Sequence, residues 1–168
     1  VLAYDAFGNY ADEWGEPGTG PGQLDAPRSV AVDGDGNVYV ADSSSYIKKF
    51  SVDGAFLFRF GGPGVFFGIS DMLVFRETLY VADGAGNTVS TYDLAGNFEK
   101  TLGTGGTLPG EFASPGGIAV DPLDSKVWVA DTGNHRAQQF DGNGNFAMVA
   151  GVRGSGTPPA GETPEFES

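Results

Sequence analysis

The stretch GGIAVDPLDSKVWVADTGNHRAQQFDGNGNFAMVAG, Gly116 to Gly151, decides the fold because two earlier stretches repeat it. They are RSVAVDGDGNVYVADSSSYIKKFSVDGAFLFRFG, Arg28 to Gly61, and SDMLVFRETLYVADGAGNTVSTYDLAGNFEKTLG, Ser70 to Gly103. Their shared V-A-D triplet recurs after 41 residues (from 42 to 83) and again after 48 (from 83 to 131). It ends at Asp42, Asp83 and Asp131. Self-similarity at such a period indicates a repeat architecture.

Each copy contains four short segments with the composition of β-strands. Apolar and polar residues alternate, β-branched and aromatic residues are frequent, and Gly, Asn and Asp separate the segments. In the first copy we expect strands at 29–33, around the VYVA segment (38–41), at 46–52 and at 55–60. Four-stranded antiparallel sheets that repeat every 40–50 residues are typical of a β-propeller, with one sheet per blade. The predicted fold class is therefore all-β.

A partial copy, LAYDAFGNYADEWG at 2–15, matches only the third and fourth strands of the other copies. We predict about 3.5 blades in five segments. They are a half blade at 1–15, blades at 16–61, 62–103 and 104–151, and a Pro/Gly-rich inter-blade loop or linker at 152–168. Propellers need about four blades to close. We therefore expect this incomplete set to belong to a larger propeller, or to a protomer that neighbouring chains complete.

The composition excludes several classes of function. The 168 residues carry 9 Lys and Arg against 22 Asp and Glu, a net charge of −13. Such an acidic surface repels phosphate backbones, so we expect no nucleic-acid partner. No apolar stretch reaches the length of a membrane span. The absence of Cys rules out disulfides and thiolate chemistry.

The segment VADTGNHRxxxFDxxGNF at 129–146 resembles the NHL repeat, with Asn134 and His135 at two of the name-giving positions. SPGGIAVD at 114–121 fits the same pattern. The other copies depart from it, with three serines at 43–45 in the first and Asn87-Thr88 in the second. The resemblance implies a propeller fold. It does not imply one ligand, because proteins of one fold serve many functions.

Polar residues of the turns recur with the repeat. A carboxylate at Asp42, Asp83 and Asp131 follows each second strand. A ligand site on one rim is one reading, but sites are normally unique whereas scaffolding repeats. We favour capping of the backbone N–H groups of the turn that follows each aspartate. Asn134 is expected to brace its turn, and Arg136 to pack or pair between blades.

Catalytic and metal-binding patterns are weak. His135 is the only histidine, whereas a zinc site needs several ligands, so we assign it a structural role. Asp33-Gly34-Asp35-Gly36-Asn37 resembles the start of a calcium loop, but Ser44 stands at the twelfth position, where the pattern requires Glu. We predict no enzyme activity, no metal and no cofactor, with calcium as the alternative because the chain is acidic.

The inter-blade connections 16–26, 61–68, 104–114 and 152–168 differ among the copies, while the strands do not. Loops on a rigid scaffold often carry binding residues. The candidate binding residues in or beside these loops are Trp14, Arg28, Phe66, Phe67, Asp71 and Arg153. The alternative is that the aromatic side chains among them pack between blades.

These observations favour a non-catalytic NHL-type propeller, outside the cell or in the periplasm, that serves as a binding or scaffold module for a protein or a glycan. One alternative is a structural protomer that assembles into an oligomer or filament through open blade edges. Another is part of a propeller enzyme whose catalytic residues lie elsewhere.

The second strands also predict the core. Tyr39, Tyr80 and Trp128 occupy one equivalent position, and Val38 and Val40 point to the opposite face from Tyr39. Both faces of a blade pack against neighbours, so we expect both sets to be buried. Replacing Trp128 with Ala is then expected to cost about 3–5 kcal/mol.

Overall fold

The structure is a computed structural model that describes residues 1–4 and 6–151. Three four-stranded antiparallel sheets contain most of the strand residues of the described chain. The first contains β5 (Ser29–Val32), β6 (Val38–Ala41), β7 (Tyr46–Phe50) and β8 (Phe56–Gly61). The second contains β9 (Ile69–Phe75), β10 (Thr78–Asp83), β11 (Thr88–Asp93) and β12 (Phe98–Gly103). The third contains β13 (Pro115–Val120), β14 (Val127–Asp131), β15 (Arg136–Phe140) and β16 (Phe146–Ala150).

Smaller elements complete the described chain. The strands β1 (Leu2–Tyr4) and β2 (Tyr10–Glu13) form an antiparallel pair. A short parallel pair joins β3 (Glu16–Pro17) to β4 (Gln23–Leu24). One 3₁₀ turn, η1 (Thr132–Asn134), links β14 to β15. The predicted tail 152–168 lies outside the described residues.

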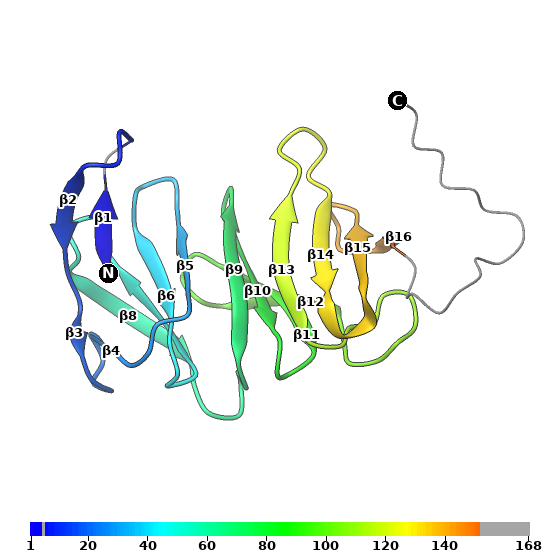
Figure 1. Ribbon diagram of the computed structural model, residues 1–168, viewed down its shortest axis with the longest axis horizontal. Helices are drawn as coiled ribbons and strands as arrows, with labels where there is room; N and C mark the ends of the chain where they lie inside the picture. Colours follow the sequence, from blue (N-terminus) through cyan, green and yellow to red (C-terminus); the bar gives the residue numbers. More distant parts are fainter. Residues whose placement is uncertain (5, 152–168) are drawn as a thin grey trace, which may run out of the picture.

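The sheets stand side by side in chain order (Figure 1). Each is a meander in which consecutive strands pair. The first strands, β5, β9 and β13, contact one another from sheet to sheet. The β1–β2 pair lies at one end of the row and the β13–β16 sheet at the other. The predicted all-β architecture of propeller blades, open and incomplete, is confirmed.

One hairpin type recurs because its sequence, Asp-x-x-Gly-Asn, supplies its own hydrogen bonds. At Asp93, Oδ1 accepts the N–H groups of Ala95 and Asn97 at 2.9 and 2.8 Å, and Oδ2 accepts the Asn97 amide at 2.8 Å. Gly96 takes a positive φ of 85°. The same bonds form at 33–37 and 141–145. The resemblance of 33–37 to a calcium loop therefore coincides with a hairpin whose carboxylate is already engaged.

Apolar clusters between the sheets form the core. Tyr39, Ala41 and Ile47 of the first blade pack against Leu79 and Val81 of the second. Tyr80, Val89 and Leu102 of the second blade pack in the same way against Val127, Val129 and Phe140 of the third. Opposite faces of one strand therefore contact opposite neighbours, as the alternation of a β-strand requires.

The predicted core is right at Tyr39, Val40 and Tyr80, which are buried, and wrong at Trp128, which is only half-buried. Tyr39 packs against the second blade, and its hydroxyl donates a hydrogen bond to the Leu94 carbonyl at 2.8 Å. Trp128 occupies the equivalent position on the third sheet, which is the last one described. None of the described residues forms a further sheet against the face that carries Trp128. Val38 is also half-buried.

Tyr39→Ala should therefore destabilise the protein more than Trp128→Ala. The first change leaves a cavity between two blades and should cost about 3–5 kcal/mol, while the second removes a half-exposed ring and should cost less than half as much. Urea unfolding of both variants measures the difference. Equal losses would contradict the packing described here.

Candidate binding face at the inter-blade loops

The inter-blade loops and the ends of the second strands share one rim of the structure. In a four-stranded meander, the second strand ends on the side where the fourth strand leaves for the next blade. Figure 1 shows the loops 62–68 and 104–114 along its lower edge, and the hairpin 121–126 at its upper edge. The three recurring aspartates therefore lie beside the predicted binding loops.

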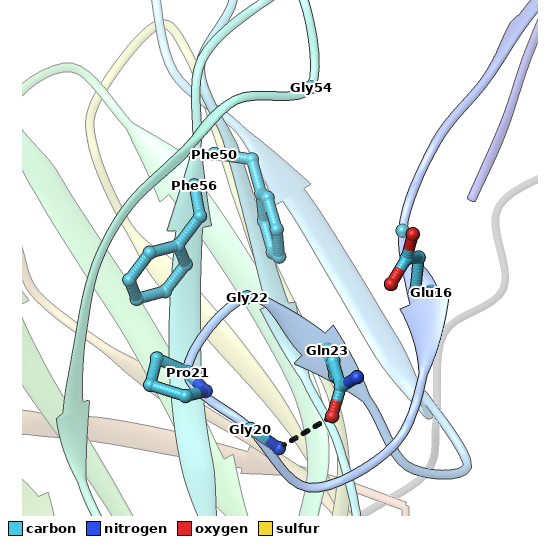
Figure 2. Close-up of a pocket in the computed structure, with 9 residues that line it drawn as sticks. Glu16, Gly20, Pro21, Gly22, Gln23, Phe50, Gly54 and Phe56 are labelled. Carbon is cyan, nitrogen blue, oxygen red and sulfur yellow. Dashed lines mark hydrogen bonds between the residues drawn. The ribbon is translucent and has the colours of Figure 1, made fainter.

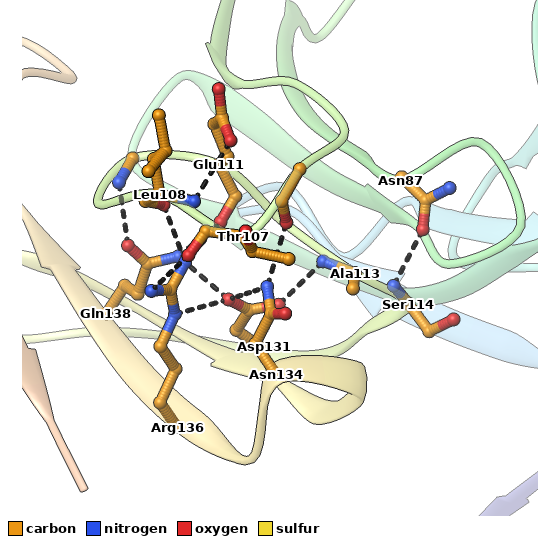
Figure 3. A network of polar contacts seen from close by, with 12 residues as sticks. Asn87, Thr107, Leu108, Glu111, Ala113, Ser114, Asp131, Asn134, Arg136 and Gln138 are labelled. Atoms are coloured by element: carbon orange, nitrogen blue, oxygen red, sulfur yellow. Dashed lines mark hydrogen bonds and ion pairs between the residues drawn. The ribbon is translucent and has the colours of Figure 1, made fainter. Parts of the chain in front are cut away.

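Asp131 is the centre of a polar network beneath the loop 104–114 (Figure 3). Its carboxylate is fully buried. Oδ1 accepts the Ala113 N–H at 2.7 Å. Oδ2 accepts hydrogen bonds from Arg136 Nε at 2.7 Å, Asn134 Nδ2 at 2.9 Å and Gln138 Nε2 at 3.0 Å. These four donors, one of them a guanidinium, satisfy the buried carboxylate without contact with water.

The donors around Asp131 also fasten the loop itself. Arg136 donates to the carbonyls of Thr107, Leu108 and Glu111 at 3.0, 2.7 and 2.8 Å. Gln138 donates to the Glu111 carbonyl at 2.7 Å and accepts the Gly110 N–H at 2.8 Å. A loop whose backbone groups are bonded in this way presents its outer side chains in fixed positions.

Asp83 braces the loop 62–68 with fewer partners. Its carboxylate accepts the N–H groups of Phe67 and Gly68, both at 2.8 Å, and the N–H of Gly86 in the following turn at 2.9 Å. The Asp83 carboxylate therefore links the turn after β10 to the loop that enters the same blade.

Asp42 makes the corresponding brace with a buried cation. Its carboxylate accepts the N–H groups of Asp25 and Ser44, both at 3.0 Å. Lys48 lies 2.5 Å away, fully buried, and also donates to the Gln23 carbonyl at 2.6 Å. Burial alone would raise the pKa of Asp42, but the hydrogen bonds from Lys48 and Ser44 hold it below its ordinary value.

The predicted capping of the following turn is present at Asp42 and Asp83, which accept the N–H groups of Ser44 and Gly86. It is wrong at Asp131, which accepts no backbone N–H of its turn because the side chains of Asn134, Arg136 and Gln138 occupy its carboxylate. The contacts to the preceding loop were not predicted.

Lys48 and Gln138, which are fully buried, were not predicted to take part either. Both donate to the aspartate of their own blade and to the carbonyl of an equivalent loop residue, Gln23 or Glu111. The available signal was a long polar side chain six or seven residues after the V-A-D aspartate, on the third strand of the blade.

The candidate binding residues do not gather in one site. Phe67 is 66% exposed on the rim. Phe66 is buried between the first two blades, so it is not on the binding face. Trp14 is half-buried against Phe50, with ring centres 4.8 Å apart.

The remaining candidates lie apart from the rim or outside the described chain. Arg28 is exposed in a groove beside Val1, at the half-blade end. Asp71 lies on β9, where its carboxylate accepts the Ile118 N–H at 2.8 Å and so links two inner strands. Arg153 lies outside the described residues.

A pocket of about 570 Å³ lies between the segment 15–23 and the β7–β8 hairpin (Figure 2). The rings of Phe50 and Phe56 stand on one side, and the Glu16 carboxylate points in from the other. Gln23 accepts the Gly20 N–H at 3.0 Å and shapes the floor. Glu16 is the sole ionisable residue of the lining, so this pocket offers no acid–base pair.

In the part of the chain that the structure describes, no group of three or more His, Cys, Asp or Glu side chains is arranged to hold a metal ion. His135 is exposed in the turn after η1, with a positive φ of 55°. No helix among the described residues is long and apolar enough to cross a membrane.

Replacing Asp131 with Asn should destabilise the protein by about 3–5 kcal/mol, because Arg136 would then be left partly buried without its anion. The control is Glu77→Gln, which removes an exposed carboxylate and should stay within about 0.5 kcal/mol of wild type. Urea unfolding measures both. A loss at Asp131 no larger than the loss at Glu77 would contradict the brace.

The lowered pKa of Asp42 predicts acid sensitivity. A carboxyl whose pKa is lower in the folded than in the unfolded state contributes stability above the unfolded pKa. That contribution disappears as the pH falls through the folded pKa. Stability should therefore decrease between about pH 5 and pH 3, and this decrease should be shallower in Asp42→Asn. Unfolding curves across this range test it, and parallel decreases in both proteins would contradict the assignment.

Comparisons with known proteins agree with the repeat pattern. The model of the NHL repeat family matches residues 112–140. Over 53 residues, 32% of this chain, the sequence is 42% identical to Protein brain tumor of Drosophila melanogaster. That match covers 5% of the Drosophila protein.

Solved structures share the fold. The virginiamycin B lyase of Staphylococcus aureus superposes with a TM-score of 0.57 at 15% identity, over 73% of this chain and 40% of the lyase. A chain of the nidogen/laminin complex superposes with a TM-score of 0.59 at 22% identity, over 71% of this chain and 46% of that chain. The chain thus spans less than half of either structure, and the likeness concerns the fold alone. The resemblance inferred from the sequence is confirmed: the chain carries an NHL repeat within a row of propeller blades.

Proposed function

We propose that this protein is a non-catalytic binding module that holds a partner protein against the inter-blade loop face. The observation that carries the proposal is the presentation of Phe67. Its ring is exposed, although its backbone N–H is hydrogen-bonded to the buried Asp83 carboxylate at 2.8 Å. The preceding ring, Phe66, is buried between two blades. An aromatic side chain held outward by a fixed backbone loses little conformational entropy on binding.

Further apolar side chains accompany Phe67 on this rim. Val65 is exposed on the same loop, and Leu108 is exposed on the neighbouring one. The Arg136 hydrogen bond to the Leu108 carbonyl fixes the position of Leu108. Exposed aromatic and aliphatic groups on a rigid frame suit the apolar centre of a protein interface. A glycan would require a row of polar donors beside the ring, so we favour a protein.

The buried carboxylates support a non-catalytic role. The four buried aspartates of the described residues all accept hydrogen bonds from turns, loops or cations of the scaffold. The net charge of −13 disfavours a nucleic-acid partner. We place the module outside the cell or in the periplasm, and fractionation of the source cells tests this part of the proposal.

The similar structures illustrate both classes of function. Nidogen was solved in complex with laminin, which is the kind of association proposed here. The lyase is an enzyme and was also solved with quinupristin.

Self-association is a second candidate function, and one observation favours it. On the last described sheet, Trp128 is half-buried, and Ala130 and Met148 are exposed. The equivalents of Trp128 in the other blades are covered by a neighbour. A monomeric mass in light scattering would exclude self-association through this face.

A photo-reactive phenylalanine analogue at position 67 should cross-link a specific protein in extracts of the source organism, and excess unmodified protein should suppress the adduct. The matched control places the same group at Leu123, which is 93% exposed on the hairpin at the opposite rim. Mass spectrometry identifies the adducts. Identical adducts at both positions, or none at position 67, would contradict the proposal.

A further inference from the structure

The pocket between the segment 15–23 and the β7–β8 hairpin has an aromatic wall that faces a carboxylate (Figure 2). The rings of Phe50 and Phe56 stand edge to face, with their centres 5.8 Å apart, and Glu16 points in from the other side. Phe56 is 36% exposed, so its ring is accessible to a ligand, whereas Phe50 is buried. The whole lining lies within residues 15–23 and 50–56, and the volume suits a small organic group.

The wall formed by the segment 15–23 is fixed by hydrogen bonds. Gln23 donates its N–H to the Gly20 carbonyl at 3.1 Å, and its side-chain oxygen accepts the Gly20 N–H at 3.0 Å. Gly18 donates to the Leu24 carbonyl at 3.1 Å. The buried Lys48 donates to the Gln23 carbonyl at 2.6 Å and so ties this wall to the third strand of the blade. The pocket is therefore formed before a ligand arrives, and binding does not have to order a loop.

The acidic wall belongs to this loop and not to the repeat. The loop of the third blade has the same length and repeats the parallel pairing of the first loop. The shared register places Thr104 at the position of Glu16. The Glu16 side chain is exposed, and its carboxylate accepts no hydrogen bond from the described residues. The first loop therefore offers an anion without a partner among those residues, opposite the ring of Phe56.

A planar cation fits both walls. A guanidinium group can stack one face on an aromatic ring while its edge donates N–H groups to a carboxylate. An ammonium group is more strongly hydrated and needs several acceptors around one point, whereas Glu16 is the sole ionisable residue of the lining. The chain already contains the stacking contact, because the Arg59 guanidinium lies 4.1 Å from the centre of the Tyr46 ring. The net charge of −13 also favours the approach of a cation.

We propose that this pocket binds a guanidinium group, carried by an arginine side chain of another protein or by a small guanidino compound. The guanidinium plane stacks on Phe56, and its N–H groups donate to Glu16. The aliphatic stem of an arginine packs along Pro21, as such stems do on apolar surfaces. The site is separate from Phe67, so a failure of the cross-linking expected there would leave this proposal intact.

The first arm of the test varies the ligand. Amide NMR of the full 168-residue chain should show saturable shifts at 15–23 and 54–56 with a blocked Gly-Arg-Gly peptide, with a dissociation constant of about 10 mM or lower. Gly-citrulline-Gly, which has the same shape without the charge, should bind at least about fivefold more weakly, and Gly-Lys-Gly at least about threefold. Methylguanidine separates the two sources. Binding as tight as that of the peptide indicates a free guanidino compound, and binding at least about threefold weaker indicates an arginine side chain.

The second arm varies the protein. Glu16→Gln and Phe56→Leu should each weaken Gly-Arg-Gly binding at least about fivefold. Phe98→Leu is the matched control, because Phe98 has the equivalent position in the second blade, 5.8 Å from Tyr92, and it should leave the affinity unchanged. Circular dichroism checks that the variants fold, and Glu16→Gln alters only an exposed side chain. No saturation up to about 50 mM peptide, equal affinity for the lysine peptide, or unchanged affinity in Glu16→Gln would overturn the proposal.

Discussion

A buried carboxylate at the end of each second strand holds a blade to the loop that enters it. Each sheet has apolar side chains on both faces, so neighbouring sheets can stack. Stacking alone does not fix the loop between two blades or the turn after the second strand. Asp83 shows the smallest version of the brace, with two N–H groups from the loop and one from the turn. At Asp42 the buried Lys48 is a further donor to the carboxylate. At Asp131 the buried Gln138 and the partly buried Arg136 are further donors.

This constraint explains how a chain rich in glycine builds a firm surface. The loop backbones are hydrogen-bonded to the buried aspartates. Some loop side chains are therefore buried between blades and others are exposed to solvent. Phe66 and Phe67 are adjacent in sequence, yet one ring lies in the core between two blades and the other lies in solvent. The binding proposal depends on this division, because a mobile Phe67 would lose much of its advantage as an anchor.

Much of the fold could be predicted because the repeat appears three times and each strand alternates. The polar contacts of the aspartates could not be predicted in the same way. They join a strand end to a loop fifteen or more residues earlier, and such contacts leave no local pattern in the sequence. Lys48 and Gln138 differ in chemistry while doing the same task, so no shared letter marks them. The burial predicted for Trp128 was wrong because burial depends on the neighbouring blade, which lies outside the repeat that contains the residue.

The most direct measurement of the central claim is native-state hydrogen exchange of the loop amides that bond to the aspartates. The amide of Ala113, 2.7 Å from Asp131, should exchange only through global unfolding, at the same free energy as the core amide of Val129. In Asp131→Asn its protection should fall by several orders of magnitude more than that of Val129. Rapid exchange of Ala113 in the wild-type protein would show that the loop opens on its own, and that the carboxylate does not hold it.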